Sequence, residues 1–445
     1  MKRVNRIFLA VGFIALAVIS WVVVLGAKSS SEKQAELVRK ANEYLDEKIY
    51  IYAIPLLEEA TLYNTNATIE IETKLKEIYL ELSNQHKYRR KYTDMLEKQM
   101  AYRDAKPDIF MEAANFFLES SKYKDAITVL KDGIKKTADE ELIALYESIR
   151  YEYKIGYTSY EDVTAYHGTT IGVKKDGLWG IARAGGKLQI PCEYERISTY
   201  SVDRAVALRD FEIFAIDADN NRIAKLSDDL EVSNFGNLSN DRIPLLFDDG
   251  WHFATGRFEI GNTSFDRIGT FLNGHAAAQY KGRWGVIDIG NAWLIPCEYS
   301  GIKMDELGRC YAQGAAFVVK GKSTYLFVDG CQIPEAYEDA KPFNQEGYAA
   351  VKKDGKWGYI DASGNLMIGY HFDDALSFGQ HLAAVRVDTE PGGNDRSNEP
   401  SERWGYISLS GDIVIEPIFL KAKSFSGGSA PVLTERGWRF ISLIE

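Results

Sequence analysis

Hydrophobic and polar residues follow three different patterns along the chain and divide it into three parts. Residues 7–27 carry no charged side chain, and at about 1.5 Å per residue such a stretch can span a membrane as one helix. From Ser31 the apolar positions recur with the period of a helix. Beyond Gly156 the period changes to two and turn residues become frequent, which predicts short strands. The pattern therefore predicts a multidomain protein with a membrane segment, a helical segment and an all-β segment.

The apolar segment is expected to be an uncleaved anchor. A signal peptide has an apolar region of about 7–15 residues and a cleavage site of small residues, whereas the bulky Leu25 stands where a small residue belongs. Lys2, Arg3 and Arg6 precede the segment, and the positive-inside rule places them in the cytoplasm. We expect a cytoplasmic tail at 1–6, a transmembrane anchor at 7–27 and an extracytoplasmic remainder. The alternative is a protein secreted after signal cleavage.

Three helical stretches share one spacing of small and aromatic residues. In order, these sets are Ala41, Tyr50, Ala53 and Ala60; Tyr79, Tyr88, Lys91 and Lys98; and Ala114, Tyr123, Ala126 and Gly133. Small residues at fixed positions let two helices approach closely. The second members of the sets, Tyr50, Tyr88 and Tyr123, recur with a period that is typical of stacked helix pairs.

This skeleton resembles the tetratricopeptide repeat family over residues 32–137, although the middle set has lysines where small residues belong. The resemblance implies a helical solenoid with a concave surface for a peptide or a partner protein. Asp139–Ile155 is expected to be the capping helix that stacked repeats need, so the helical domain is expected at 32–155. An irregular bundle of helical hairpins is the alternative.

A Trp-Gly pair organises the rest of the chain. It occurs in the strings GLWGIA, GRWGVID, GKWGYID and ERWGYIS, and degenerate copies are GWHFAT and GWRFIS. Two further copies lack tryptophan and are centred on Ile213 and Tyr325, which gives eight copies at similar intervals. The intervals that end at Tyr325 and at Trp404 are longer than the others. The repeat positions singled out as structural are Trp179, Gly180, Trp251, Trp284, Gly285, Trp357, Gly358, Trp404, Gly405 and Trp438.

Each copy predicts a small antiparallel sheet. In the best copy, alternating residues 348–352 predict a strand, Asp354-Gly355 a hairpin turn, and residues 357–360 a second strand. The tryptophan can fill the gap between neighbouring sheets, and the glycine beside it permits close approach of backbone. A third strand follows at 366–368, and the aromatic–acid pair Phe372-Asp373 begins the link to the next copy. Four copies keep one constant spacing from the tryptophan to this aromatic, in the pairs Trp179/Tyr194, Trp284/Tyr299, Trp357/Phe372 and Trp404/Phe419.

These strings resemble the WG-repeat family, which is found in many bacterial surface and secreted proteins. The resemblance covers about 160–445 and implies an all-β repeat domain, expected at 157–445, with a binding or scaffolding role. The last copy ends at Glu445, before its aromatic would occur, and Tyr160 precedes Trp179 by the step that separates Phe265 from Trp284. The N-terminal edge is therefore expected to complete the last sheet. We expect an eight-bladed β-propeller-like ring, with an open β-repeat superhelix as the alternative.

Composition and motifs argue for binding rather than catalysis. The net charge of −11 disfavours nucleic acid, whose binding rests on neutralising phosphates. Lys320-Gly321-Lys322 lacks the strand-to-helix setting of a phosphate loop, and residues 217–228 lack the glycine and the glutamate of a calcium loop. The histidines have no zinc spacing, the cysteines have no CxxC spacing, and only Cys310 and Cys331 are candidates for pairing. We expect no catalytic residues, metal or cofactor.

The resulting hypothesis is a non-enzymatic, membrane-anchored scaffold that binds a protein or peptide partner outside the cytoplasm. One alternative is a cell-envelope glycan hydrolase with carboxylates from separate blades meeting in the central funnel, about 5–10 Å apart. Another is a glycan-binding module, which would cluster exposed aromatics on one face. The inserted segment Asp388–Arg403 has the composition of a surface loop and is more simply a tolerated insertion than a functional one.

Overall fold

The computed structural model describes residues 30–389 and 401–444, and the chain forms two compact units that divide between Ser148 and Ile149. The expected tail at 1–6 and anchor at 7–27 lie outside the described residues, as does most of the insertion. Within the described residues, no helix is both long enough and apolar enough to cross a membrane. The first unit is helical and the second is built of strands, as the change of hydrophobic period predicts.

The helices of the first unit follow one another with short connections. They are a helix over residues 30–46, α2 (Tyr50–Thr61), α3 (Thr68–Glu81), α4 (His86–Met100), α5 (Pro107–Glu119), α6 (Tyr123–Thr137) and α7 (Glu140–Ile149). The small residues of the first and third sets are buried where helices meet. Ala53 and Ala126 are fully buried, and a Cβ on Gly133 would lie only 2.7 Å from the Phe110 ring.

The lysines of the middle set are accommodated by ion pairs. Lys91 of α4 pairs with Glu58 of α2, and the Tyr79 hydroxyl donates a hydrogen bond of 2.5 Å to the same carboxylate. Lys98 pairs with Glu72 at 3.0 Å. A charged residue can therefore replace a small one here because α2 and α3 supply its counter-charge.

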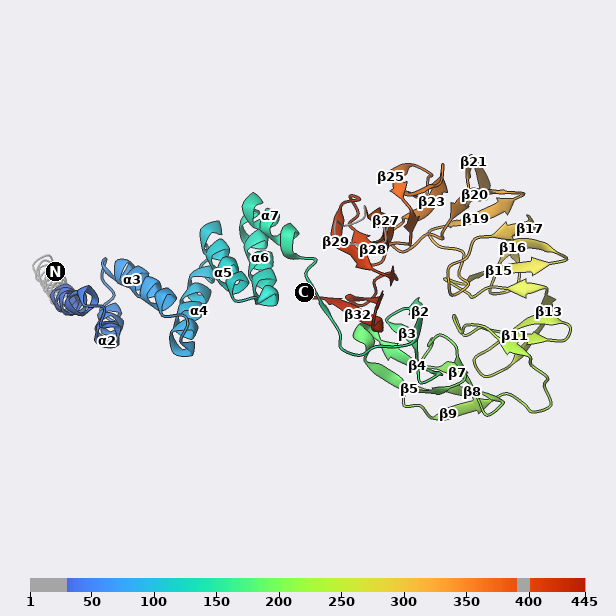
Figure 1. Ribbon diagram of the computed structural model, residues 1–445, viewed down its shortest axis with the longest axis horizontal. Coiled ribbons are helices and arrows are strands. Elements are labelled where there is room, and N and C mark those ends of the chain that lie inside the picture. The colour runs from blue at the N-terminus through green and yellow to red at the C-terminus, as the bar shows by residue number, and fades with distance from the viewer. Residues whose placement is uncertain (1–29, 390–400, 445) are drawn as a thin grey trace, which may run out of the picture. The chain divides into compact units, whose positions relative to one another are not determined.

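The second unit is a ring of eight four-stranded antiparallel sheets, here called blades 1 to 8 (Figure 1). Blades 1 to 4 are β2 (Asp162–His167), β3 (Thr170–Lys175), β4 (Leu178–Arg183) and β5 (Leu188–Tyr194); β6 (Arg196–Ile197), β7 (Ala205–Arg209), β8 (Glu212–Ile216) and β9 (Arg222–Lys225); β10 (Asn234–Phe235), β11 (Ile243–Phe247), β12 (Gly250–Ala254) and β13 (Ile260–Phe265); and β14 (Arg267–Ile268), β15 (His275–Tyr280), β16 (Arg283–Asp288) and β17 (Trp293–Tyr299). One short 3-10 turn, η1 (Ala184–Gly186), follows β4.

The second half of the ring repeats the plan. Blades 5 to 8 are β18 (Gly301–Ile302), β19 (Ala315–Lys320), β20 (Ser323–Val328) and β21 (Cys331–Tyr337); β22 (Asp339–Ala340), β23 (Ala349–Lys353), β24 (Lys356–Ile360) and β25 (Leu366–Phe372); β26 (Asp374–Ala375), β27 (Ala383–Thr389), β28 (Ser401–Ile407) and β29 (Ile413–Phe419); and β30 (Lys421–Ala422), β31 (Ser429–Thr434), β32 (Gly437–Leu443) and β1 (Tyr153–Ile155). Figure 1 shows fourth strands such as β5, β9 and β21 at the outer rim.

The ring is closed by the two ends of the unit, which confirms the expected propeller and excludes the open superhelix. β1 pairs with β32, with Ile155 opposite Ile441, and Tyr160 forms an isolated bridge with Trp438. The residues that close the ring begin at Tyr153, however, whereas the β domain was predicted to begin at residue 157. The helix expected to reach Ile155 ends at Ile149, and β1 lies inside the segment 32–155 that was assigned to helices. A strand this short cannot show a period of two, which explains the error.

The core lies between neighbouring blades. Tyr359 and Ile368 of blade 6 pack with Val385 and Ile407 of blade 7 in one buried cluster. Similar clusters join blades 5 and 6, and blades 7 and 8. Each blade is therefore held by its neighbours on both sides.

Candidate functional site

The repeat tryptophans stand on the third strand of their blades and face the outer strand. Trp357 is 4 % exposed and Trp438 is 8 % exposed, while the others are half-buried. Trp357 lies opposite Phe372 in the strand register, and Trp404 lies opposite Phe419 in the same way. The aromatic at constant spacing downstream is thus the cross-strand partner of the tryptophan. Trp179, Trp251 and Trp284 have the same relationship to Tyr194, Phe265 and Tyr299.

The glycine after the tryptophan makes room for a bulge in the outer strand. In blade 1 the register passes from Trp179 opposite Tyr194 to Ile181 opposite Ile190, so the outer strand holds extra residues there. A Cβ on Gly180, Gly285, Gly358 or Gly405 would lie within 2.7 Å of a carbonyl oxygen of that strand. Only glycine fits such a close approach.

Copies without this glycine pair differently. Phe214, His252 and Tyr325 hold the glycine position, and each lies directly opposite an outer-strand residue, so the register shift comes after this position and not at it. This register also corrects the fifth copy. Thr324, opposite Tyr337, holds the tryptophan position, and Tyr325 is one residue too late. The aromatic size of Tyr325 suggested the wrong residue, whereas Thr324 is 1 % exposed.

The acid of the aromatic–acid pair caps a hairpin turn. Glu161 accepts a hydrogen bond from the Gly177 N–H at 3.1 Å, and Asp266 accepts one from the Gly282 N–H at 2.7 Å. Glu195 and Glu338 do the same for Asp210 and Gly355. These acids therefore fix the turn between the second and third strands.

One loop departs from the repeat and reaches into the centre of the ring. Residues 303–314 connect β18 to β19 in blade 5, whereas the equivalent connection in blade 4 is only residues 269–274. We call residues 303–314 the channel loop. Its length is visible in the sequence as the long interval between Trp284 and Tyr325. Sequence reasoning gave this interval no function.

The channel loop contacts four other blades beside their innermost strands. Arg309 donates a hydrogen bond of 3.3 Å to the backbone oxygen of Tyr166 in blade 1, which faces blade 5 across a ring of eight. The buried Leu307 accepts hydrogen bonds at its backbone oxygen from Asn237 of blade 3 and Thr270 of blade 4. Glu306 pairs with Lys423 of blade 8. The loop therefore crosses the channel at the end where the first and second strands of the blades are connected.

Both carboxylates of the channel loop are engaged by cations. Asp305 pairs with Arg309 at 2.5 Å, and Glu306 pairs with Lys423. Burial and the nearby Arg309 charge lower the pKa of His167 to about 4, and its Nδ1 has no hydrogen-bond partner. His167 is therefore a neutral imidazole at neutral pH. The arrangement is a set of packing contacts with internally balanced charge.

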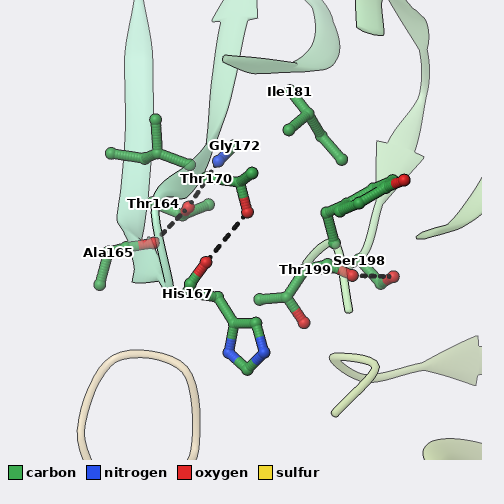
Figure 2. Close-up of a pocket in the computed structure, with 10 residues that line it drawn as sticks. Thr164, Ala165, His167, Thr170, Gly172, Ile181, Ser198 and Thr199 are labelled. Carbon is green, nitrogen blue, oxygen red and sulfur yellow. Dashed lines mark hydrogen bonds between the residues drawn. The ribbon is translucent and has the colours of Figure 1, made fainter. Parts of the chain in front are cut away.

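A small hollow with a cavity volume of about 10 Å³ opens beside His167, between blades 1 and 2 (Figure 2). Thr164, Thr170 and Ser198 line it, but their hydroxyls are hydrogen-bonded to backbone groups at 2.9 to 3.0 Å. Ligand pockets usually measure about 300–1,000 Å³. The hollow is therefore below the size of a small-molecule site.

The other candidate groups have structural partners or stand alone. Asp217 accepts hydrogen bonds from the N–H groups of Asp219 and Asn221, so the residues considered for calcium form a turn. The four cysteines are free, with Cys310 buried and Cys331 exposed, so the pairing considered for these two does not form. Across residues 30–389 and 401–444, no group of three or more His, Cys, Asp or Glu side chains is placed to hold a metal.

The comparisons with known proteins concern the second unit. No curated protein matches the chain. Among solved structures, Hsv2 of Kluyvelomyces marxianus has 10 % identity and a TM-score of 0.36 over 56 % of this chain and 97 % of that chain. The WD40 domain of Pan2 from Neurospora crassa has 9 % identity and a TM-score of 0.31 over 51 % and 85 %. At these scores the likenesses carry no inference about function.

The sequence family gives the more specific result. The WG containing repeat matches residues 284–322, 333–357, 357–388 and 404–438. These matches fall in blades 4 to 8 and include Trp284, Trp357, Trp404 and Trp438. The C-terminal region of this chain therefore carries WG containing repeats, folded here as blades of a closed propeller.

Proposed function

We propose that the chain is a non-enzymatic scaffold that binds partner proteins through the outer surfaces of its two units. The observation that supports this most is the channel loop. In many propellers the central opening is a natural place for a small ligand, but here the channel loop crosses one end of it, with Leu307 buried. Binding surfaces are then left to the faces, the turns and the rim of the ring.

We propose that the helical unit is a tetratricopeptide-like solenoid and binds a peptide or protein segment. This is supported by the full burial of Ala41, Ala53 and Ala114, which lets consecutive helices stack closely. Stacked helix pairs form extended concave surfaces that suit such ligands. We further propose that residues 7–27 hold both units at the outer surface of a cell membrane, on the basis of their uncharged sequence.

A glycan-directed function has weaker support. A hydrolase in the channel would need two carboxylates that face a substrate across about 5–10 Å, whereas Asp305 and Glu306 of the channel loop are adjacent in sequence and are each paired with a cation of the protein. Among the described residues of the propeller, the large exposed aromatics come from blade 2, from blade 4 and from the link between β1 and β2. They are Phe211, Tyr280, Trp293 and Tyr157. Such a distribution does not favour the single platform on which a sugar chain would stack.

Crosslinking in cells tests the proposal. The full chain is compared with a chain lacking residues 30–148 and with a chain lacking residues 149–445, and the proteins crosslinked to each are identified. We expect two separable sets of partners, each lost with one unit. Binding of cell-wall glycan by the purified full chain, with no protein crosslinked to either unit, would replace the scaffold by a glycan-binding function. Carbonate extraction and external protease test the anchor independently.

A further inference from the structure

The turn between the second and third strands has one composition in blades 1, 4 and 6 and another in blade 2. In blades 1 and 6 it is Asp176-Gly177 and Asp354-Gly355, and in blade 4 it is Lys281-Gly282. Both residues of these turns have positive φ, and the second is glycine in all three. In blade 2 the same two positions are Asp210 and Phe211, with φ of 53° and 66°.

Phe211 thus adopts a left-handed conformation that a bulky residue rarely takes, where blades 1, 4 and 6 use glycine. Packing of the Phe211 side chain on the described residues does not offset this strain, because the side chain is 97 % exposed. Phe258 is a useful contrast. It has the same φ of 66°, but it is half-buried and packs against the core between blades 2 and 3. Strained backbone with no internal compensation is typical of functional positions.

The Phe211 turn is rigidly supported. Glu195 accepts a hydrogen bond of 2.9 Å from the Asp210 N–H, and Arg209 lies opposite Glu212 at the end of the hairpin. A phenyl ring on such a turn is displayed without a flexible loop beneath it. The backbone that carries the ring is already held in place, so binding has to order only the torsions of the side chain itself, and this suits an anchoring residue at an interface.

The charges beside Phe211 specify what it fits. Glu212 is neutralised by Arg222 at 2.8 Å and Lys225 at 2.7 Å. Asp210 is different, because its side chain is 82 % exposed and its cation, Arg209, lies 3.6 Å away. An exposed carboxylate next to the phenyl ring disfavours insertion into an anionic lipid surface and favours a cation on the other side.

We propose that Asp210 and Phe211 together anchor a partner protein that offers an apolar pocket for the ring, with a lysine or arginine at the mouth of the pocket for the carboxylate. This inference rests on the proposed scaffold function and names one of its contact points. The partner is of a different kind from this chain, and the site is on blade 2 of the propeller and not on the helical unit.

The test places a photo-reactive benzoylphenylalanine at position 211 of the full chain in cells. The matched control places it at Gly355, the equivalent turn residue, where φ is 78° and a Cβ meets nothing within 4 Å. A third chain combines the probe at 211 with Asp210→Lys, which copies the Lys281 of blade 4 and so suits the turn. We expect one discrete protein adduct from position 211, none from 355, and a yield at least tenfold lower with Asp210→Lys. The adduct is identified by mass spectrometry.

The identified partner is then purified and titrated with the full chain and with its Phe211→Gly variant. We expect affinity to fall at least 30-fold in the variant while its melting temperature does not fall. A lipid adduct, an adduct with a second copy of this chain, or equal affinity of the two chains would overturn the inference. If position 211 gives no adduct while the helical unit still crosslinks to its own partner, this contact point fails and the scaffold function stands. If neither unit crosslinks to any protein, the scaffold function fails as well.

Discussion

Tyr160 and Trp438 exchange two backbone hydrogen bonds, of 2.8 and 2.9 Å, although they stand near opposite ends of the propeller sequence. Tyr160 takes the place that Tyr194 takes beside Trp179 in blade 1, so the last blade borrows its aromatic from the first residues of the unit. Both ends of the unit are therefore needed for one blade.

A chain that begins at Tyr157 is expected to be less stable than one that begins at Ile149. The shorter chain lacks β1, the hydrogen bond from the Gly156 N–H to Phe440 and the bond from the Ile444 N–H to Glu152. At about 1 kcal/mol for each hydrogen bond, we expect a loss of about 3–5 kcal/mol in the free energy of unfolding. Thermal melting of the two purified propellers measures it. Equal melting temperatures would mean that β1 contributes nothing to closure.

Gly358→Ala is expected to destabilise the propeller by about 1–3 kcal/mol, the range for overpacking. The added methyl group would lie 2.7 Å from the Ile368 carbonyl oxygen, so the outer strand of blade 6 must move. The control is Gly301→Ala, at which a Cβ lies 3.4 Å from the Val319 side chain and φ is not positive. Urea titration of both variants makes the comparison. An equal effect of the two substitutions would contradict the role of the bulge.

Trp357→Ala is expected to cost about 3–5 kcal/mol, because a large buried side chain is removed from the core between blades 6 and 7. Trp293→Ala should cost clearly less, since Trp293 is 39 % exposed and lies outside the repeat position. Far-UV circular dichroism during heating measures both. If Trp357→Ala left melting unchanged and abolished binding of a glycan or peptide, the tryptophan would be a ligand contact and not a structural one.

Acid is expected to weaken the propeller through His167. Its pKa is about 4 in the folded protein, against an ordinary value of about 6.5, because burial and Arg309 oppose its charge. The unfolded chain therefore binds the proton first, and stability present above about pH 6.5 is lost as the pH falls towards 4. We expect the melting temperature of His167→Gln to fall less between pH 7 and pH 4.5 than that of the wild type. His86→Gln, at an exposed histidine of α4, should leave the slope unchanged.

Phe211→Gly and Phe258→Gly are expected to act in opposite directions. Glycine relieves the left-handed strain at both sites, but it also raises the entropy of the unfolded chain. At position 211 no packing is lost, so we expect a change between zero and a gain of about 1 kcal/mol. At position 258 the lost core contacts should dominate, with a cost of roughly 2 kcal/mol. If Phe211→Gly lowered the free energy of unfolding as Phe258→Gly does, the Phe211 side chain would have stabilising contacts within the protein.

Much of the propeller could be predicted because the same residue types recur at equivalent positions in most of its blades. Trp-Gly marks a bulge, and the aromatic at constant spacing downstream is its cross-strand partner, so the spacing itself encodes the register. The prediction was weakest where those residues change. Thr324 takes the tryptophan position without resembling it, and Tyr153–Ile155 is too short to display a strand pattern.

The channel loop and the Phe211 turn could not be recognised from the sequence for a different reason. The contact of Arg309 with Tyr166 depends on two blades facing each other, which is known only once the ring is closed. The significance of Phe211 depends on its positive φ and on the glycines at the equivalent positions of blades 1, 4 and 6. It can be recognised only when the turns of the blades are aligned with one another. The long interval between Trp284 and Tyr325 is the sequence signal for the channel loop. An alignment of the hairpin turns of the eight blades is the signal for the Phe211 turn.

The channel loop also affects how cooperatively the ring is expected to unfold. A propeller of independent blades resembles a one-dimensional array, in which each repeat senses only its neighbours and partial unfolding can begin anywhere. Residues 303–314 connect blade 5 to blades 1, 3, 4 and 8 at once, in the manner of a hub. Loss of any one of these blades then removes contacts from a shared centre. The ring gains long-range cooperativity from a single loop, and the fraying expected of a simple repeat array is suppressed.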